Sequence, residues 1–205
     1  TVTIPSQISP HLFLNDALTE TDLAGSRLCF AAMTTLRHMD AQGGIGLTKS
    51  GAFNRKFVTW AVDQFNWPHY TAEELYVDNK VINEDDVPPL NYLHELLRGA
   101  KLIRHSKGKA VLTKTGKAQL GNYGRLQATL FETFFTKFDF AAYERWPIEM
   151  SDADTFHFLG VIRNRLHDWV AFKEFASWCL PIYALPATRC TPAQAATFYL
   201  ETHLV

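Results

Sequence analysis

A short β-hairpin that follows three helical segments constrains the fold of this chain most strongly. Two strand-like runs, 102–105 and 109–112, flank Ser106-Lys107-Gly108, and a glycine in so short a connection is typical of a tight hairpin. Before the hairpin, apolar spacing predicts helices over 50–66, 71–79 and 88–99. Three helices followed by a hairpin is the order of a winged helix-turn-helix unit, in which the third helix would be the recognition helix.

Helix-start signals support this order. Thr71 and Glu74 have the spacing of a capping box. One phrase occurs twice, as Leu47-Thr48-Lys49-Ser50-Gly51 and as Leu112-Thr113-Lys114-Thr115-Gly116. Because a threonine oxygen can accept a hydrogen bond from the first turn of a helix, we expect Thr48 and Thr113 each to cap a helix.

The rest of the chain is also predicted to be helical. Apolar residues predict one helix over about 22–41 and another near 153–176, while phenylalanine, tyrosine and tryptophan crowd the segment after Gly121. The predicted fold class is mainly α, a winged helix-turn-helix-like unit with a short β-hairpin, flanked by a helical lobe. The expected divisions are an N-terminal helical segment (1–46), a winged-helix-like domain (47–118) and an aromatic-rich helical lobe (119–205).

Composition excludes several classes of protein. The 205 residues are 47% hydrophobic and 20% charged, which is typical of a globular protein. Lys plus Arg number 20 and Asp plus Glu number 21, so the chain is neither a basic nucleic-acid coat nor an acidic tail. Three widely spaced cysteines with no C-x-x-C pair indicate a reducing, cytoplasmic compartment. No apolar run approaches the ~18 residues that a membrane span needs.

Charge patterning points to the hairpin as the binding surface. No acidic residue lies between Glu95 and Glu132, whereas eight lysines and arginines do. Cations on a hairpin can neutralise phosphates and give sequence-independent, salt-sensitive affinity for double-stranded DNA. Asn91 and His94 are expected to face the groove from the third helix. The predicted phosphate contacts come from Arg98, Lys101, Arg104, Lys107, Lys109 and Lys114.

Two other functions stay open. Residues 73–95 hold seven acids and one base, and this charge would repel DNA from the third helix. The alternative is therefore a protein-interaction module, in which the winged helix is a scaffold and the aromatic lobe holds a partner. An enzyme would need a concave pocket with converging titratable groups.

The remaining motifs predict no catalytic residue, cofactor or metal site. Gly43-Gly44-Ile45-Gly46-Leu47-Thr48-Lys49-Ser50 looks like a phosphate loop, but Thr48 stands where a glycine must precede the lysine, so we expect a flexible connector. Glu84-Asp85-Asp86 offers oxygen ligands for Mg²⁺, although acids at the start of a helix also have a structural reason. The eight histidines show no zinc spacing.

Several phrases resemble an uncharacterised bacterial family. They include Asn83-Glu-Asp-Asp-Val-Pro-Pro-Leu, Lys107-Gly-Lys-Ala-Val-Leu-Thr-Lys-Thr-Gly and Phe134-Phe-Thr-Lys-Phe. The chain is similar here to proteins described as plasmid open-reading-frame-three-like or SEC-C-motif-associated. The resemblance spans about 45–180 and implies a winged-helix-like region and a bacterial, cytoplasmic origin. The Cys/His motif of the SEC-C segment is absent from this sequence, so the resemblance implies no metal, and it carries no function.

Overall fold

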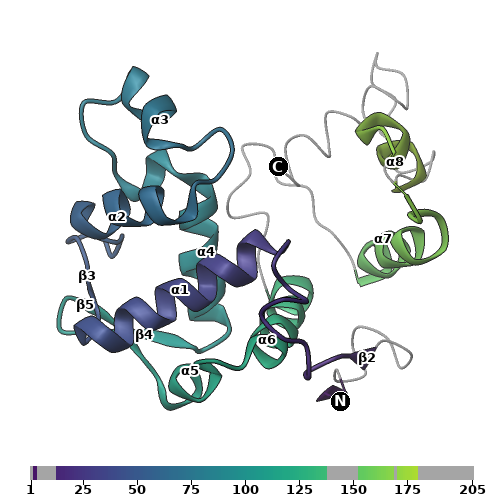
Figure 1. The fold of residues 1–205 in the computed structure, drawn as a ribbon, viewed down its shortest axis with the longest axis horizontal. Helices are drawn as coiled ribbons and strands as arrows, with labels where there is room; N and C mark the ends of the chain where they lie inside the picture. The colour runs from purple at the N-terminus through teal and green to yellow at the C-terminus, as the bar shows by residue number, and fades with distance from the viewer. Residues whose placement is uncertain (1, 4–12, 138–151, 169, 180–205) are drawn as a thin grey trace. The chain divides into compact units, whose positions relative to one another are not determined.

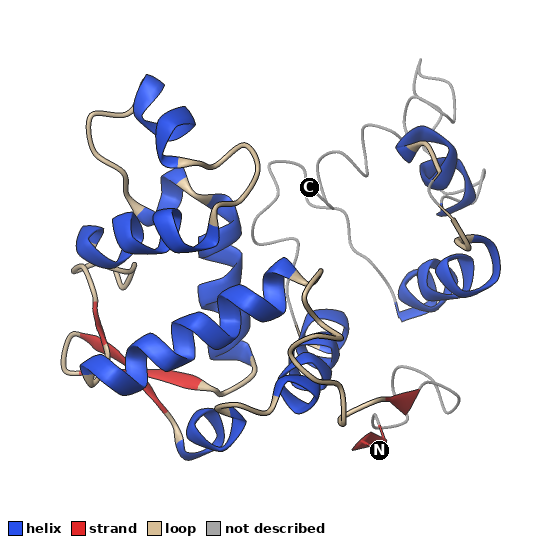
Figure 2. Ribbon diagram, viewed as in Figure 1, coloured by secondary structure: helices blue, strands red, loops and turns tan. Residues whose placement is uncertain are grey.

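The computed structural model describes residues 2–3, 13–137, 152–168 and 170–179. These residues belong to two compact units, the first made of 2–3 and 13–137 and the second of 152–168 and 170–179. Helices make up most of the described residues, and the first unit also holds a small antiparallel sheet (Figure 1; Figure 2). The predicted mainly α class with a hairpin is confirmed.

In the first unit, elements follow one another in the order β1 (Val2–Thr3), β2 (Phe13–Leu14), α1 (Arg27–Gln42), β3 (Ile45–Gly46), α2 (Arg55–Phe65), α3 (Ala72–Asp78), the 3₁₀ helix η1 (Glu84–Asp86), α4 (Pro88–Gly99), β4 (Ile103–Ser106), β5 (Lys109–Leu112), α5 (Lys114–Gln119) and α6 (Tyr123–Thr136). The two-residue strands β1 and β2 pair with each other. The three predicted helices before the hairpin are α2, α3 and α4.

The main sheet has the strand order β3-β5-β4, and both pairs are antiparallel. The hairpin of β4 and β5 is confirmed, with a connection of two residues, Lys107 and Gly108. The sequence did not predict β3, because its stretch was expected to be a flexible connector. That expectation is wrong: Ile45 pairs with Ala110 and is buried, so the end of α1 is joined directly to the sheet.

Helix α1 lies at the centre of the first unit and packs against α2, α4, α6 and β5. It begins after Ser26, whose side chain accepts a hydrogen bond from the backbone N–H of Cys29. The largest fully buried side chains of the core are Met33, Leu36, Met39, Phe53, Ile82, Leu90, Leu93, Leu96, Leu97, Leu102 and Leu126. Burying each of them contributes about 1.5–3 kcal/mol relative to leaving it in water.

The repeated phrase starts a helix only in its second copy. Thr113 caps α5, because its hydroxyl oxygen accepts from the N–H of Gly116, as predicted. The prediction for Thr48 is wrong: α2 begins at Arg55, and Asn54 is its cap. A bridge between Leu47 and Phe53 closes residues 47–53 into a tight loop instead. In this loop the backbone N–H of Thr48 donates to the oxygen of Ala52.

The helices before the hairpin follow the predicted signals. Thr71 and Glu74 form a capping box at the start of α3. Pro88 occupies the first turn of α4, where a missing backbone N–H costs nothing. One face of α4 is entirely buried, so its position in the core is fixed by packing.

Helix α6 belongs to the first unit, because it packs against α1, α4 and α5. Tyr123, Leu126 and Leu130 of α6 join the same core as the residues of α1 and α4. Both predicted domain boundaries, 46/47 and 118/119, fall inside this unit.

The described part of the second unit consists of α7 (Asp152–Arg165) and α8 (Phe172–Cys179). The sequence predicted a single helix near 153–176, and this is wrong, since α7 ends at Arg165 and residues 167 and 168 form a bend before α8. No glycine or proline lies at the break, so the sequence carries no local signal for it. Val161, Ala176 and Cys179 form a small core. The aromatic run 138–146 and the predicted last helix to Val205 lie outside the described residues.

Candidate functional site

The hairpin separates its side chains onto two faces. Arg104 pairs with Val111 and Ser106 pairs with Lys109, and because side chains alternate along a strand these four residues share one face. The pairs Ile103–Leu112 and His105–Ala110 occupy the other face. Ile103 and Ala110 are buried there. The first face, hereafter the outer face, therefore holds the cations, and the second contacts the protein interior.

The turn presents a lysine at the tip of the hairpin. Lys107 and Gly108 both have positive φ, 50° and 72°, which is the pattern of a two-residue type I′ turn. Glycine adopts this conformation without strain, whereas a lysine does so at some cost. The Lys107 side chain is exposed, and the turn holds it beyond the last paired residues of the sheet.

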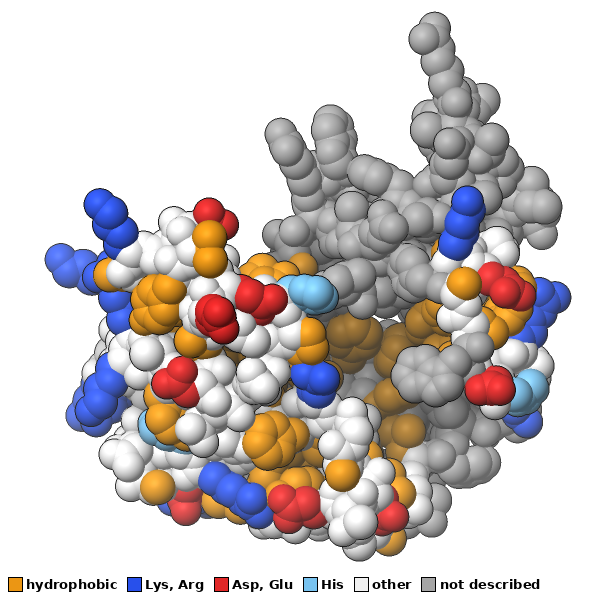
Figure 3. Space-filling view, turned by 45° about the horizontal axis from the view of Figure 1, so that its top comes forward, with side chains coloured by type: hydrophobic (Ala, Val, Ile, Leu, Met, Phe, Trp, Pro, Cys, Tyr) orange, Lys and Arg blue, Asp and Glu red, His pale blue; other side chains and the backbone are white. Residues whose placement is uncertain are grey.

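Five of the predicted phosphate contacts are exposed and lack an ion pair within the described part of the chain: Lys101, Arg104, Lys107, Lys109 and Lys114. Arg98 is exposed as well, but its guanidinium lies 2.7 Å from a carboxylate oxygen of Glu95. Figure 3 shows several Lys and Arg side chains projecting together at its left edge. Apart from Arg98, the predicted cations of the hairpin and of the segments at its two ends thus have no acidic partner among the residues that the structure describes.

Two side chains of α4 that the sequence predicted to face a groove, Asn91 and His94, have partners within the fold. Asn91 is half-buried, and its side-chain amide donates to Asp85 at 3.2 Å. The expectation that His94 faces a groove is wrong, because only 3% of it is exposed. His94 follows Leu90 by four residues and precedes Leu97 by three, so all three share the buried face of the helix. This spacing was the signal in the sequence that could have placed it.

A chain of three ionisable residues runs from the core to the surface, and sequence reasoning missed it. His94 Nδ1 lies 2.7 Å from Oε1 of Glu84, and His94 Nε2 lies 2.9 Å from Nε2 of His105. Glu84 is only 2% exposed. Its other carboxylate oxygen accepts the backbone N–H of Phe53, whose ring stacks on His94 with 3.8 Å between centroids. Both carboxylate oxygens of Glu84 and both ring nitrogens of His94 therefore have partners.

The surroundings of His105 favour its neutral form. Burial lowers the pKa of His105, and the neighbouring His94 and Arg98 lower it further, against a smaller opposite effect of Glu95 and Glu84. A neutral His94 that donates from Nδ1 to the Glu84 carboxylate keeps Nε2 as an acceptor. That nitrogen can then accept the Nε2–H of His105, so the three side chains form one continuous series of hydrogen bonds.

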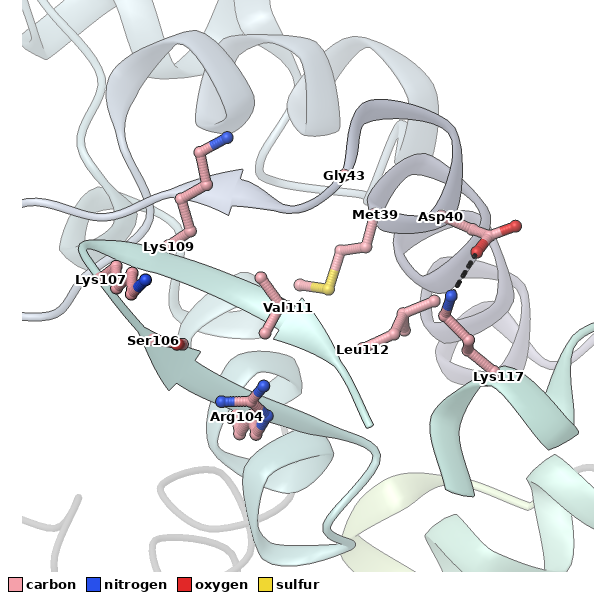
Figure 4. A pocket seen from close by; sticks show the side chains of 10 residues that line it. All are labelled: Met39, Asp40, Gly43, Arg104, Ser106, Lys107, Lys109, Val111, Leu112 and Lys117. Atoms are coloured by element: carbon pink, nitrogen blue, oxygen red, sulfur yellow. Dashed lines mark ion pairs between the residues drawn. The ribbon is translucent and has the colours of Figure 1, made fainter. Parts of the chain in front are cut away.

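The outer face borders a depression of about 500 Å³ (Figure 4). Met39 from the last turns of α1 contributes to its lining together with Val111 and Leu112 of β5. Four cations also line it, Arg104, Lys107, Lys109 and Lys117. In Figure 4, Lys107 and Lys109 lie on one side of the three apolar side chains and Lys117 lies on the other.

The one acidic side chain of the depression is Asp40. It lies 3.9 Å from the ammonium nitrogen of Lys117, and both side chains are about half exposed or more. An ion pair that long and that exposed contributes about 0–1 kcal/mol. The depression therefore keeps an excess of positive charge, with an apolar centre.

Within the described ranges, no three His, Cys, Asp or Glu side chains converge on a point where a metal ion could sit. None of the described helices combines the length and the apolar character that a membrane span requires. Cys29 and Cys179 are free thiols, and burial raises the pKa of each to about 11.

Comparisons with known proteins place the site inside a matched region. Residues 24–125 match the family model described as the Y4jL N-terminal domain. The chain is 43% identical over 99 residues to an uncharacterized protein y4jL of Sinorhizobium fredii. The aligned residues make up 48% of this chain and 45% of that protein. The chain thus spans less than half the length of this curated relative. No solved structure matches.

The matched residues run from just before α1 into α6, so they include the sheet, the hairpin and the Glu84–His94–His105 chain. The comparisons do not support the narrower plasmid open-reading-frame-three or SEC-C name. They show that residues 24–125 of this chain are similar to an uncharacterised bacterial family.

Proposed function

We propose that the first unit is a non-enzymatic, winged-helix module that binds nucleic acid through the basic hairpin. The observation that carries the proposal is the set of five exposed cations on and beside the hairpin, which have no acidic partner within the described ranges. Lysines and arginines in such positions bind phosphates and release counterions, which gives affinity for any duplex. Here the hairpin is the wing.

The order of elements supports the winged-helix interpretation. A helix and a short strand (α1, β3) precede two helices (α2, α4) and the hairpin, and the first strand pairs with the last. In this arrangement α4 is the recognition helix and the hairpin lies next to it in the chain. The inserted α3 and η1 separate α2 from α4.

Helix α4 itself contributes little positive charge to this function. Its exposed Arg98 is paired with Glu95, and Asn91 is bonded to Asp85. Base-specific contacts need donors and acceptors that reach the groove, and these partners compete for them. The proposal therefore concerns binding to phosphates, with sequence preference a secondary feature.

The test is duplex binding measured by fluorescence anisotropy at several salt concentrations. The wild-type protein should bind a random-sequence duplex with a Kd of about 10⁻⁴–10⁻⁶ M, and the affinity should fall steeply with salt. Lys107→Glu combined with Lys109→Glu should reduce the affinity at least about tenfold and flatten the salt dependence by about two units of slope.

The matched control is Lys80→Glu combined with Lys173→Glu. Both of these lysines are exposed, neither lies on the hairpin, and the double variant changes the net charge equally. It should lose much less affinity. Equal losses in the two double variants, or unchanged binding in the hairpin variant, would overturn the proposal.

A second candidate function is protein binding, favoured by an apolar surface on α3 and the segment after it. Tyr76, Val77 and Val81 are exposed, Val77 by 78%, and adjacent exposed apolar side chains often mark a contact surface. Figure 3 shows apolar side chains beside acidic ones on the displayed face. If this surface holds a partner, Val77→Asp should abolish retention of that partner without changing duplex affinity.

A further inference from the structure

We infer that the depression beside the hairpin binds one unpaired nucleotide, with the phosphate on its cations and the base against its apolar centre. This inference rests on the proposed function and deepens it, because it names the part of a nucleic acid that the hairpin recognises.

The charge of the depression suits a phosphate. Arg104 and Lys109 extend from the sheet and Lys117 extends from α5, so cations approach the same space from separate elements (Figure 4). Cations gathered around a hollow with apolar walls concentrate anions there. The loose contact between Lys117 and Asp40 leaves the ammonium group free to bind a ligand.

The apolar centre can contact the ring of a base, whereas it offers no favourable contact to a phosphate group alone. Met39 is 2% exposed and lies beneath the surface, so the half-buried Val111 and Leu112 form most of the accessible apolar floor. Aliphatic side chains offer an apolar surface on which a flat ring can be buried from water. The volume of about 500 Å³ falls in the range of about 300–1,000 Å³ that is usual for small-molecule sites.

Base pairing decides which nucleotide can reach this floor. In an intact duplex the faces of a base are stacked and only its edges are accessible in the grooves. An unpaired nucleotide, at a strand end or in a single strand, can place its ring on a protein surface. The combination of cationic rim and apolar floor therefore selects an unpaired nucleotide over a paired one.

The experiment is a titration of the full chain with adenosine 5′-monophosphate, followed by isothermal titration calorimetry or by NMR. Adenosine and inorganic phosphate are titrated separately. The nucleotide should bind at least about tenfold more tightly than either part, because both regions of the depression contribute. Lys117→Gln should lower the affinity for the nucleotide about three- to tenfold. Lys80→Gln, which changes an exposed lysine outside the depression, should leave that affinity unchanged.

The source of the nucleotide is identified by competition. A 5′-phosphorylated single strand that displaces the mononucleotide identifies a strand as the ligand, and a single strand that fails to displace it identifies a free nucleotide. A blunt duplex should displace it less effectively than the single strand, because the duplex competes for the cations alone and not for the apolar centre. Either strand result supports the depression as a nucleotide site.

Three outcomes separate this inference from the proposed function. Equal affinity for phosphate and mononucleotide would overturn the inference, because the floor would contribute nothing. Duplex binding without any mononucleotide binding would overturn the inference and leave the proposed function intact. Mononucleotide binding by a protein that binds no strand or duplex would support the inference and overturn the proposed function.

Discussion

The two faces of β4 carry ionisable side chains in opposite surroundings. Arg104 lies on the outer face, exposed, with no acidic partner among the described residues. One residue later, His105 reaches the buried Glu84–His94 pair on the other face. An exposed, unpaired charge is inexpensive for the fold and available to a ligand, whereas a buried pair is satisfied within the fold and contacts no ligand. We therefore expect stability and binding to separate by face.

The largest expected change in unfolding free energy comes from a substitution in the buried Glu84–His94 pair. Glu84→Ala removes the acceptor of both His94 and the N–H of Phe53, and leaves buried donors without partners. Breaking a buried pair in this way costs about 3–5 kcal/mol of unfolding free energy, which denaturant unfolding would measure. The control Glu95→Ala breaks only the exposed pair with Arg98 and should cost less than about 1 kcal/mol. A cost for Glu84→Ala as small as the control's would contradict the comparison.

A substitution on the outer face should change nucleic-acid affinity and leave the unfolding free energy almost unaffected. Arg104→Gln should leave the unfolding free energy within about 0.5 kcal/mol of wild type, because the guanidinium makes no hydrogen bond or ion pair with a described residue. The same change should weaken duplex binding at low salt and reduce the salt slope by about one unit. Loss of stability without loss of affinity would show that the outer face supports the fold instead of a ligand.

The sequence predicted most helices and the hairpin, because those features depend on local signals. The capping box at Thr71 and the proline at the start of α4 act within one turn of helix, and the structure has both. The two copies of Leu-Thr-Lys-x-Gly show where local signals stop. Thr113 caps a helix, while Thr48 lies in a loop closed by the bridge between Leu47 and Phe53. Phe53 is in turn held by contacts with the distant residues Glu84 and His94.

The candidate site was also predicted only in part, because only some of its features depend on neighbouring residues in the sequence. A run of cations without acids can be read from the sequence, and the exposed lysines of the hairpin follow from it. The depression could not be predicted, because Met39 and Lys117 join the hairpin only through the tertiary packing of α1 and α5. His94 was misplaced because a polar residue on a helix was expected to face outward, and its partner Glu84 lies on another element.

The smallest predicted effect is a dependence of stability on pH through the buried face. Burial lowers the pKa of His105, and also that of His38, which lies against Trp60. The unfolded chain therefore binds protons more readily than the folded one, so unfolding free energy should fall as the pH falls through about 6.5. His105→Gln should make this fall shallower, while Arg104→Gln should not alter it. Denaturant unfolding at pH 7.5 and pH 5.5 would measure the difference, and a fall of equal size in both variants would show that His105 takes no part in it.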